Sequence, residues 1–206
     1  MTTKRKSIIT AIVVLVLLLG LTVIFKVQHT ANIQRAREVT LRRRLHERTV
    51  KKATTPQPTV VNWHAPSETN HAYPDVSKYP NLQIDVSIKK QRVYLENDGH
   101  VLYTMLASTG KPGSTTPRGN FKIQPERGLH FYNASSGEGA NYWVSFKGNG
   151  IYLFHSVPVD IHDHYVVSQA NQLGKKSNSH GCVRLSIADA KWMYENIPLN
   201  TPVHIH

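Results

Sequence analysis

The chain is organised around one stretch, Ser179-His180-Gly181-Cys182-Val183-Arg184-Leu185-Ser186. Cys182 is the only cysteine among the 206 residues, so its thiol has no partner for an intramolecular disulfide. Gly181 lets the backbone approach a second molecule closely, and Ser186 begins a pattern typical of a helix start. Because a thiol near a helix N-terminus tends towards the nucleophilic thiolate, we interpret Cys182 as a nucleophile rather than as a small buried apolar side chain.

A thiol nucleophile needs a base close to it in space, most often a histidine. His155 is the candidate, because it follows the apolar run Ile151-Tyr152-Leu153-Phe154 and should lie at the end of a buried strand. In this hypothesis His155 takes the proton of Cys182, and the backbone carbonyl of Ser156 holds the other ring nitrogen. The backbone N–H groups of Gly181 and Cys182 are the expected oxyanion donors, since they lie on the turn that carries the nucleophile.

These motifs resemble those of a known family. His155-Ser156 and the block from Ser179 to Arg184 resemble the signature of the YkuD-type L,D-transpeptidases, which cross-link peptidoglycan. The resemblance extends through the stretches Ser108-Thr109-Gly110-Lys111-Pro112 and Thr116-Pro117-Arg118-Gly119-Asn120-Phe121, and covers about residues 80 to 206. It implies two packed sheets with the cysteine at their edge, and a thioester on Cys182 that forms with release of a D-amino acid. An amine from a second peptidoglycan stem peptide then resolves the thioester, and no cofactor is expected.

The chain departs from the family pattern in two respects. Residues 156–178 form a longer spacer between the two motifs than family members usually have, and the excess falls in the polar segment 160–177. Arg184 stands where some members carry asparagine. We assign Ser179, His180 and Arg184 to substrate binding, because a guanidinium fork suits carboxylates. Bracing of the turn by His180, and pairing of Arg184 with a local acidic residue, are equal alternatives.

Other functions stay open at this point. An L,D-carboxypeptidase, or an enzyme that attaches proteins to the wall, would use the same Cys/His chemistry. A zinc site is the rival from another class, because His162 and His164 join His155, His180 and Cys182 as candidate ligands. Against zinc, the histidine pair lies in a polar loop and there is one cysteine, so no metal ligands are predicted. A catalytically inactive wall-binding module is disfavoured by the presence of both the thiol and its base.

Residues 1–27 are predicted to anchor the chain in a membrane. The segment from Ser7 to Phe25 carries no charge and is rich in Ile, Val and Leu, and it has about the length of a membrane-spanning helix. No small-residue cleavage site is evident after it, so we expect an uncleaved anchor. Lys4-Arg5-Lys6 favours a cytoplasmic N-terminus, although arginines also follow the segment. Peptidoglycan lies outside the cell, so the resemblance implies a single-pass protein of the cell membrane with an extracytoplasmic catalytic domain.

Residues 28–79 are predicted to form a basic stalk followed by a linker. Twelve Lys and Arg residues against Glu38 and Glu47 give the first 55 residues +10 of the formal net charge of +12. A nucleic-acid partner is therefore not expected, because a binding domain should carry its own basic face. We prefer a solvated stalk, and contact with anionic headgroups or wall polymers is the alternative. Four prolines between residues 53 and 79 predict a semi-extended linker.

Residues 80–206 are predicted to form the catalytic domain, which is mainly β with one clear helix. Alternating apolar and polar residues predict strands at 82–88 and 203–205, and further strands are predicted at 92–96, 101–107, 121–123, 142–146 and the apolar run 151–154. Asn97-Asp98-Gly99 is a typical hairpin turn between the second and third strands. Ser186 is expected to cap a helix that Pro198 ends, with its apolar face formed by Ile187, Ala190, Tyr194 and Ile197.

Overall fold

The computed structural model describes residues 61–206 and, before them, only Lys26, Gln28, Thr30, Gln34, Arg37, Glu38 and Thr40. These earlier residues are helical and exposed. The predicted membrane segment, Ser7 to Phe25, lies outside the described residues, as does most of the predicted stalk, so both stay predictions. Within the part of the chain that is described, no helix combines the length and the apolar character needed to cross a membrane.

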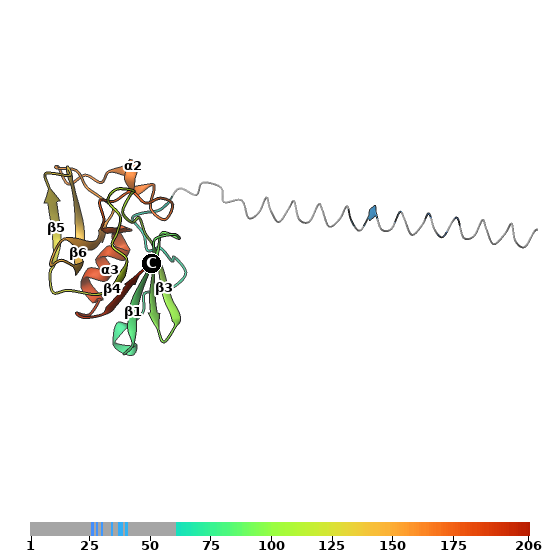
Figure 1. Ribbon diagram of the computed structural model, residues 1–206, viewed down its shortest axis with the longest axis horizontal. Helices are drawn as coiled ribbons and strands as arrows, with labels where there is room; N and C mark the ends of the chain where they lie inside the picture. Colours follow the sequence, from blue (N-terminus) through green and yellow to red (C-terminus); the bar gives the residue numbers. More distant parts are fainter. Residues whose placement is uncertain are drawn as a thin grey trace, which may run out of the picture. The chain divides into compact units, whose positions relative to one another are not determined.

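The domain is built from two mixed β-sheets (Figure 1). The first contains β1 (Leu82–Ser87), β2 (Arg92–Asn97), β3 (His100–Leu106), β4 (Gly119–Lys122) and β9 (Pro202–Ile205), in the order β3-β2-β1-β9-β4. The second contains β5 (Arg127–Asn133), β6 (Glu138–Lys147), β7 (Tyr152–Ser156) and β8 (Val183–Leu185), in sequence order. Only β1–β9 and β7–β8 are parallel pairs among these neighbours. The prediction of a mainly β fold with two packed mixed sheets is confirmed.

The first sheet follows directly from the period-2 pattern of its sequence. Leu82, Ile84 and Val86 of β1 are buried in the core, whereas Gln83 and Asp85 lie on the other face and are half-buried. The hairpin between β2 and β3 turns at Asp98 and Gly99, which both have positive φ, as the turn sequence predicts. The apolar face of this sheet therefore forms one wall of the core.

The one long helix of the domain, α3 (Ile187–Asn196), begins and ends where the sequence predicts. The Ser186 side chain accepts a hydrogen bond from the backbone N–H of Asp189 at 3.1 Å and so caps the helix. Ala190 and Met193 are buried in the core, and the helix packs against β6, β7 and β8 of the second sheet. The chain then crosses to β9, which inserts between β1 and β4 of the first sheet.

Four elements were not predicted: β5, β8, the short helix α2 (Val167–Ala170) and the 3₁₀ helix η1 (Val76–Lys78). Leu129 and Tyr132 of β5 are exposed, so this edge strand lacks the buried and exposed alternation that identifies the other strands. Gly128 is required in β5 by packing, because a Cβ atom there would lie 2.7 Å from the indole nitrogen of Trp143 on β6. Edge strands and single-turn helices depend on such neighbours more than on their own periodicity.

The folded domain begins near Val60, and not at residue 80 as the sequence predicted. Trp63 is buried in a small cluster with Val157, Ala170 and Leu173. The backbone carbonyl of Trp63 accepts a hydrogen bond from the N–H of Ile187 at 2.9 Å, at the first turn of α3. Residues 61–79 are thus part of the domain, although they form no strand and only the short 3₁₀ helix Val76–Lys78.

A buried carboxylate of α3 holds this N-terminal segment in place. Asp189 accepts hydrogen bonds from the Tyr73 hydroxyl at 2.7 Å and from the backbone N–H of Ser67 at 3.2 Å, and also from the Ser67 hydroxyl. The ring of Tyr73 stacks on Trp192 with 5.1 Å between the centroids. The sequence indicated a linker because this segment is rich in proline. Its few aromatic residues, which pack against the rest of the domain, gave no regular pattern.

Candidate active site

The parallel pairing of β7 with β8 brings the two predicted reactive residues together. His155 is in register with Arg184, and Phe154 with Val183. Side chains two residues apart on a strand point to the same face, so Cys182, directly before β8, shares a face with Arg184 and His155. All three line one cavity of about 270 Å³, whose walls also include Trp143 and Phe131. The thiol and the imidazole therefore open into the same space.

His155 is held in one tautomer and one orientation. Its Nδ1 lies 2.6 Å from the backbone carbonyl oxygen of Ser156, and because a carbonyl can only accept, Nδ1 carries the proton. The edge-to-face ring of Phe131, with 5.6 Å between centroids, packs against the imidazole. Nε2 is then the unprotonated nitrogen that can accept a proton. The Ser156 hydroxyl has a separate role: it donates to the Val157 carbonyl and accepts from the N–H of Asn141.

Burial disfavours the ionised form of both the Cys182 thiol and the His155 imidazole. Burial, helped by the positive charge of Arg184, lowers the pKa of His155 to about 3. Burial raises the pKa of the Cys182 thiol to about 11, and the Arg184 charge opposes this shift only in part. Burial thus opposes the thiolate that the sequence suggested, while the charge of Arg184 favours it.

The turn before the thiol is braced by Ser179. The Ser179 hydroxyl donates to the carbonyl of Cys182 at 2.5 Å and accepts from the N–H of Gly181 at 3.1 Å. Gly181 has a φ of +123°, and a Cβ atom there would lie 3.0 Å from the ring of Tyr152, so glycine is required. The Gly181 N–H, predicted as an oxyanion donor, is thus engaged by Ser179 in this structure. Ser179 itself is buried, which makes turn bracing its visible role.

Arg184 pairs with protein groups rather than standing free for a substrate. It is one of the largest fully enclosed side chains, with 2% of its surface exposed. One Nη atom donates to Glu138 and the other to Gln169, each at 2.6 Å. The sequence left open whether Arg184 binds a substrate carboxylate or pairs with a local acidic residue, and in the structure it pairs with Glu138. The guanidinium consequently acts on the site through its charge, which lies near both Cys182 and His155.

Glu138 and Gln169 are two site residues that the sequence did not reveal. Glu138 begins β6 four residues before the strand was predicted to start, and Gln169 lies on α2 within the long segment 160–177. The amide of Gln169 also donates to Glu138. The extra length of that segment, already visible in the sequence, therefore supplies a partner for the buried Arg184. The unusual length of segment 160–177 was the sequence feature that could have pointed to this partner.

His180 also lines the cavity, and it is more exposed than His155. Its side chain is 44% exposed; Nδ1 is 3.4 Å from a Glu138 carboxylate oxygen and Nε2 is 3.1 Å from the Lys111 ammonium. Among the described residues, no hydrogen bond links the Cys182 sulfur to His155 or to His180; the sulfur instead contacts the carbonyl of Ile151 at 3.7 Å. His180 and Lys111 thus form a polar rim.

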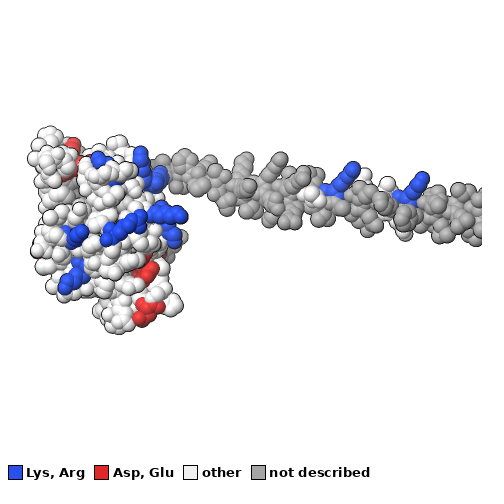
Figure 2. Space-filling view, in the orientation of Figure 1, with Lys and Arg blue, Asp and Glu red and all other residues white. Residues whose placement is uncertain are grey.

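The zinc alternative finds no support around Cys182. His162 and His164 are exposed on the long loop, and in residues 61–206 no group of three metal-ligand side chains forms at the cavity. On the face of the domain shown in Figure 2, Lys and Arg side chains lie at several places, and the fewer Asp and Glu side chains lie towards its upper and lower ends.

The fold and the site together define a class of domain: a two-sheet β domain in which a cysteine and a histidine, on neighbouring parallel strands, share a cavity. Residues 81–205 match the model of the YkuD L,D-transpeptidase catalytic domain. This match spans more than half of the chain, and the chain belongs to that family. The predicted family resemblance is confirmed.

Individual relatives agree with this assignment. YciB of Bacillus subtilis (strain 168), itself only provisionally named an L,D-transpeptidase, is 44% identical over 150 residues, which are 71% of this chain and 75% of YciB. L,D-transpeptidase 1 of Mycobacterium tuberculosis (strain H37Rv) is 31% identical over 130 residues, 58% of this chain and 48% of that protein. The solved structure of LdtMt1 in complex with imipenem matches with a TM-score of 0.51 and 25% identity, and covers 61% of this chain and 59% of that one.

We predict that alkylation of Cys182 by iodoacetamide depends on His155 and not on His180. The wild-type rate should keep rising above pH 8.5, because burial raises the pKa of the thiol, and should show no inflection near pH 6.5, because the pKa of His155 is lowered. Substituting His155→Ala should slow alkylation at pH 7 by about 100-fold, the usual size of a general-base contribution. His180→Ala is the matched control, and a larger loss in that variant would reverse the two roles.

We predict that Glu138→Gln destabilises the domain through Arg184. The buried guanidinium would lose its counter-charge, which typically costs about 3 kcal/mol or more. Asp163→Asn removes the same charge from an exposed pair with His130 and should change stability by less than about 1 kcal/mol. Urea unfolding of both variants compares the two effects. Equal midpoints would show that the Glu138 pair contributes no more than a surface pair.

Proposed function

We propose that the chain is a cysteine-dependent L,D-transpeptidase that acts on peptidoglycan stem peptides through a thioester on Cys182. The observation that carries this proposal is the shared cavity of Cys182 and His155, with Nδ1 of His155 fixed by the Ser156 carbonyl. Family membership gives the reaction class. The same arrangement would serve hydrolysis if water replaced the acceptor amine, so the acceptor is a separate question for the product analysis below.

The two neutral groups suit a stepwise acyl transfer. As the Cys182 sulfur attacks the peptide carbonyl carbon, its proton passes to Nε2 of His155. The tetrahedral intermediate collapses when this proton passes to the leaving amine, and a D-amino acid departs. The amine of a second stem peptide then attacks the thioester, again losing a proton to His155, and the thiol is restored. The nearby charge of Arg184 favours the developing thiolate over the thiol.

The developing oxyanion needs donors close to the attacked carbonyl. The backbone N–H groups of Cys182 and Gly181 remain our proposal, and one such donor is typically worth about 3 kcal/mol. The Gly181 N–H becomes available when its 3.1 Å bond to the Ser179 hydroxyl is exchanged for the oxyanion. Ser179 would then support the turn through its remaining bond to the Cys182 carbonyl.

The cavity walls fit a peptide that ends in carboxylates. Phe131 and Trp143 offer apolar faces, while the Lys111 ammonium, which donates to Nε2 of His180, keeps further N–H groups that can donate to a carboxylate. We propose that this rim, rather than the buried Arg184, contacts the charged ends of the stem peptide. His180 thereby keeps the substrate-binding role proposed from the sequence, and Lys111 joins it.

We predict that a carbapenem acylates Cys182. The mycobacterial relative LdtMt1 is known in complex with imipenem, and a β-lactam ring opens on attack without losing a leaving group. Mass spectrometry should therefore show an increase equal to one intact imipenem. Cys182→Ala should show none, and should form no cross-linked or trimmed muropeptides from purified sacculi.

The control for this experiment is His162→Gln, an exposed substitution on the long loop that should leave acylation unchanged. Thermal melting establishes that Cys182→Ala is folded. Muropeptide products retained by Cys182→Ala would overturn the nucleophile assignment. Trimmed stems without new cross-links would identify the carboxypeptidase alternative, in which water resolves the thioester.

We also propose that Ser7 to Phe25 anchors the chain in the cell membrane, with residues 61–206 on the wall side. The expected result of labelling intact cells with a membrane-impermeant maleimide, in a Cys182→Ala background, is modification of Glu195→Cys. Glu195 is exposed on α3. Thr3→Cys should be labelled only after lysis. The opposite pattern would place the domain inside and remove peptidoglycan as its substrate.

A further inference from the structure

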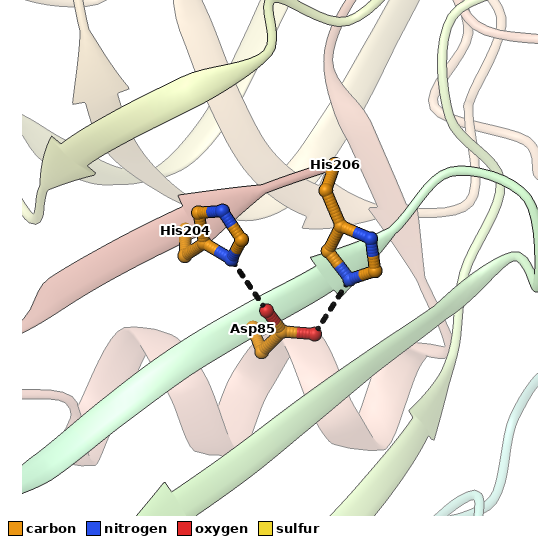
Figure 3. Close-up of side chains that lie close together, drawn as sticks. All are labelled: Asp85, His204 and His206. Carbon is orange, nitrogen blue, oxygen red and sulfur yellow. Dashed lines mark hydrogen bonds and ion pairs between the residues drawn. The ribbon is translucent and has the colours of Figure 1, made fainter.

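Three side chains on the outer face of the first sheet converge away from the active site (Figure 3). Asp85 lies on β1 and His204 on β9, and His206 directly follows β9, two residues after His204, so both imidazoles emerge from the same face. Asp85 and His204 are also direct partners in the parallel register of β1 and β9. Sheet geometry, rather than a mobile loop, therefore sets this cluster.

The distances within this cluster suit a shared ion. His204 Nδ1 is 2.9 Å from one carboxylate oxygen of Asp85, and His206 Nε2 is 3.1 Å from the other. Two ligands on a tetrahedral zinc ion are about 3.3 Å apart, given Zn–N bonds of about 2.0–2.1 Å. One ligand atom from each of the three side chains lies within 4.8 Å of the other two. An ion would lengthen the two contacts with Asp85 by a few tenths of an ångström, and rotation of the exposed imidazoles would bring their nitrogens to the distance that the ion requires.

The exposure of the two imidazoles and the types of ligand atom present both suit a bound metal ion. The imidazoles of His204 and His206 are 54% and 52% exposed, so water can complete the coordination. Their rings stack nearly parallel, 13° apart with 5.2 Å between centroids. Two imidazole nitrogens and one carboxylate oxygen are the ligand types that zinc and neighbouring divalent ions prefer. Within the described part of the chain, Asp85 forms ion pairs with these two histidines only.

We propose that Asp85, His204 and His206 bind one divalent transition-metal ion, with zinc as its representative. This site is separate from the reaction centre, because none of the three residues lines the active-site cavity. The ion would join β1 to β9, strands that are 119 positions apart at Asp85 and His204. Because β9 lies between β1 and β4, such a link ties the C-terminal strand into the first sheet.

The chain contains its own matched control. Asp160, His162 and His164 repeat the same residue types, including the His-x-His spacing, on the long loop. There the Asp160–His164 contact is 3.7 Å, the His162 and His164 rings are 6.2 Å apart, and the three side chains do not form a convergent group. A metal ion that bound any exposed His-x-His pair would therefore bind to both groups of residues.

The test uses the full chain, purified without a histidine tag and with Cys182→Ala, so that neither a tag nor the thiol contributes ligands. Zinc chloride is titrated in the micromolar range by calorimetry at pH 7.5, and thermal melting is followed with and without zinc. We expect one equivalent to bind and the melting temperature to rise, since the ion binds the folded state. His204→Gln, His206→Gln and Asp85→Asn should each weaken binding by about 10-fold or more.

His162→Gln/His164→Gln should leave the affinity and the zinc-induced melting shift unchanged. Melting without zinc shows whether each variant is folded, and Asp85→Asn preserves the shape of the site. Absence of zinc binding in this range, or equal binding in a folded His204→Gln/His206→Gln variant, would overturn the proposal. Loss of binding in the loop variant instead would place the ion on the control segment.

Discussion

The parallel pairing of β7 and β8 is the constraint on which the site depends. Parallel strands need a long crossover between them, and here that crossover is the whole segment from Val157 to Cys182. The register of this one strand pair places His155 opposite Arg184 and Cys182 on the same face. On the other side of β8, the backbone N–H groups of Ser108 and Lys111, in the loop after β3, donate hydrogen bonds to the carbonyls of Arg184 and Ser179. The reactive groups are therefore positioned by backbone pairing on both sides.

The charge of Arg184 then influences the protonation of Cys182 and His155. The buried Arg184 cation is tolerated because Glu138 and Gln169 pair with it, and its charge reaches both reactive groups. Since Glu138 also approaches His180, the buried pair and the polar rim share one carboxylate. The cavity wall and its mouth are thus linked through a single acidic side chain on β6.

The sequence predicts the parts of this fold that carry a regular pattern or a motif. Alternation in β1, the turn at Asp98 and the cap at Ser186 are local signals, and the structure contains all three features. His155 and Cys182 were recognisable because their chemistry needs particular neighbours. The docking of residues 61–79, the edge strand β5 and the partners of Arg184 depend on contacts between distant positions, and no local pattern encodes them. The burial that keeps the thiol neutral belongs to the same category.

The neutral state of Cys182 has a consequence for its chemical survival. Peroxides and similar oxidants attack the thiolate form, and protonated thiols react far more slowly. A thiol whose pKa burial raises to about 11 is almost entirely protonated at neutral pH. Without a second cysteine in the chain, an oxidised sulfur would have no internal partner to rescue it through a disulfide. Burial in the cavity should therefore slow the oxidation of Cys182 by keeping its thiol protonated.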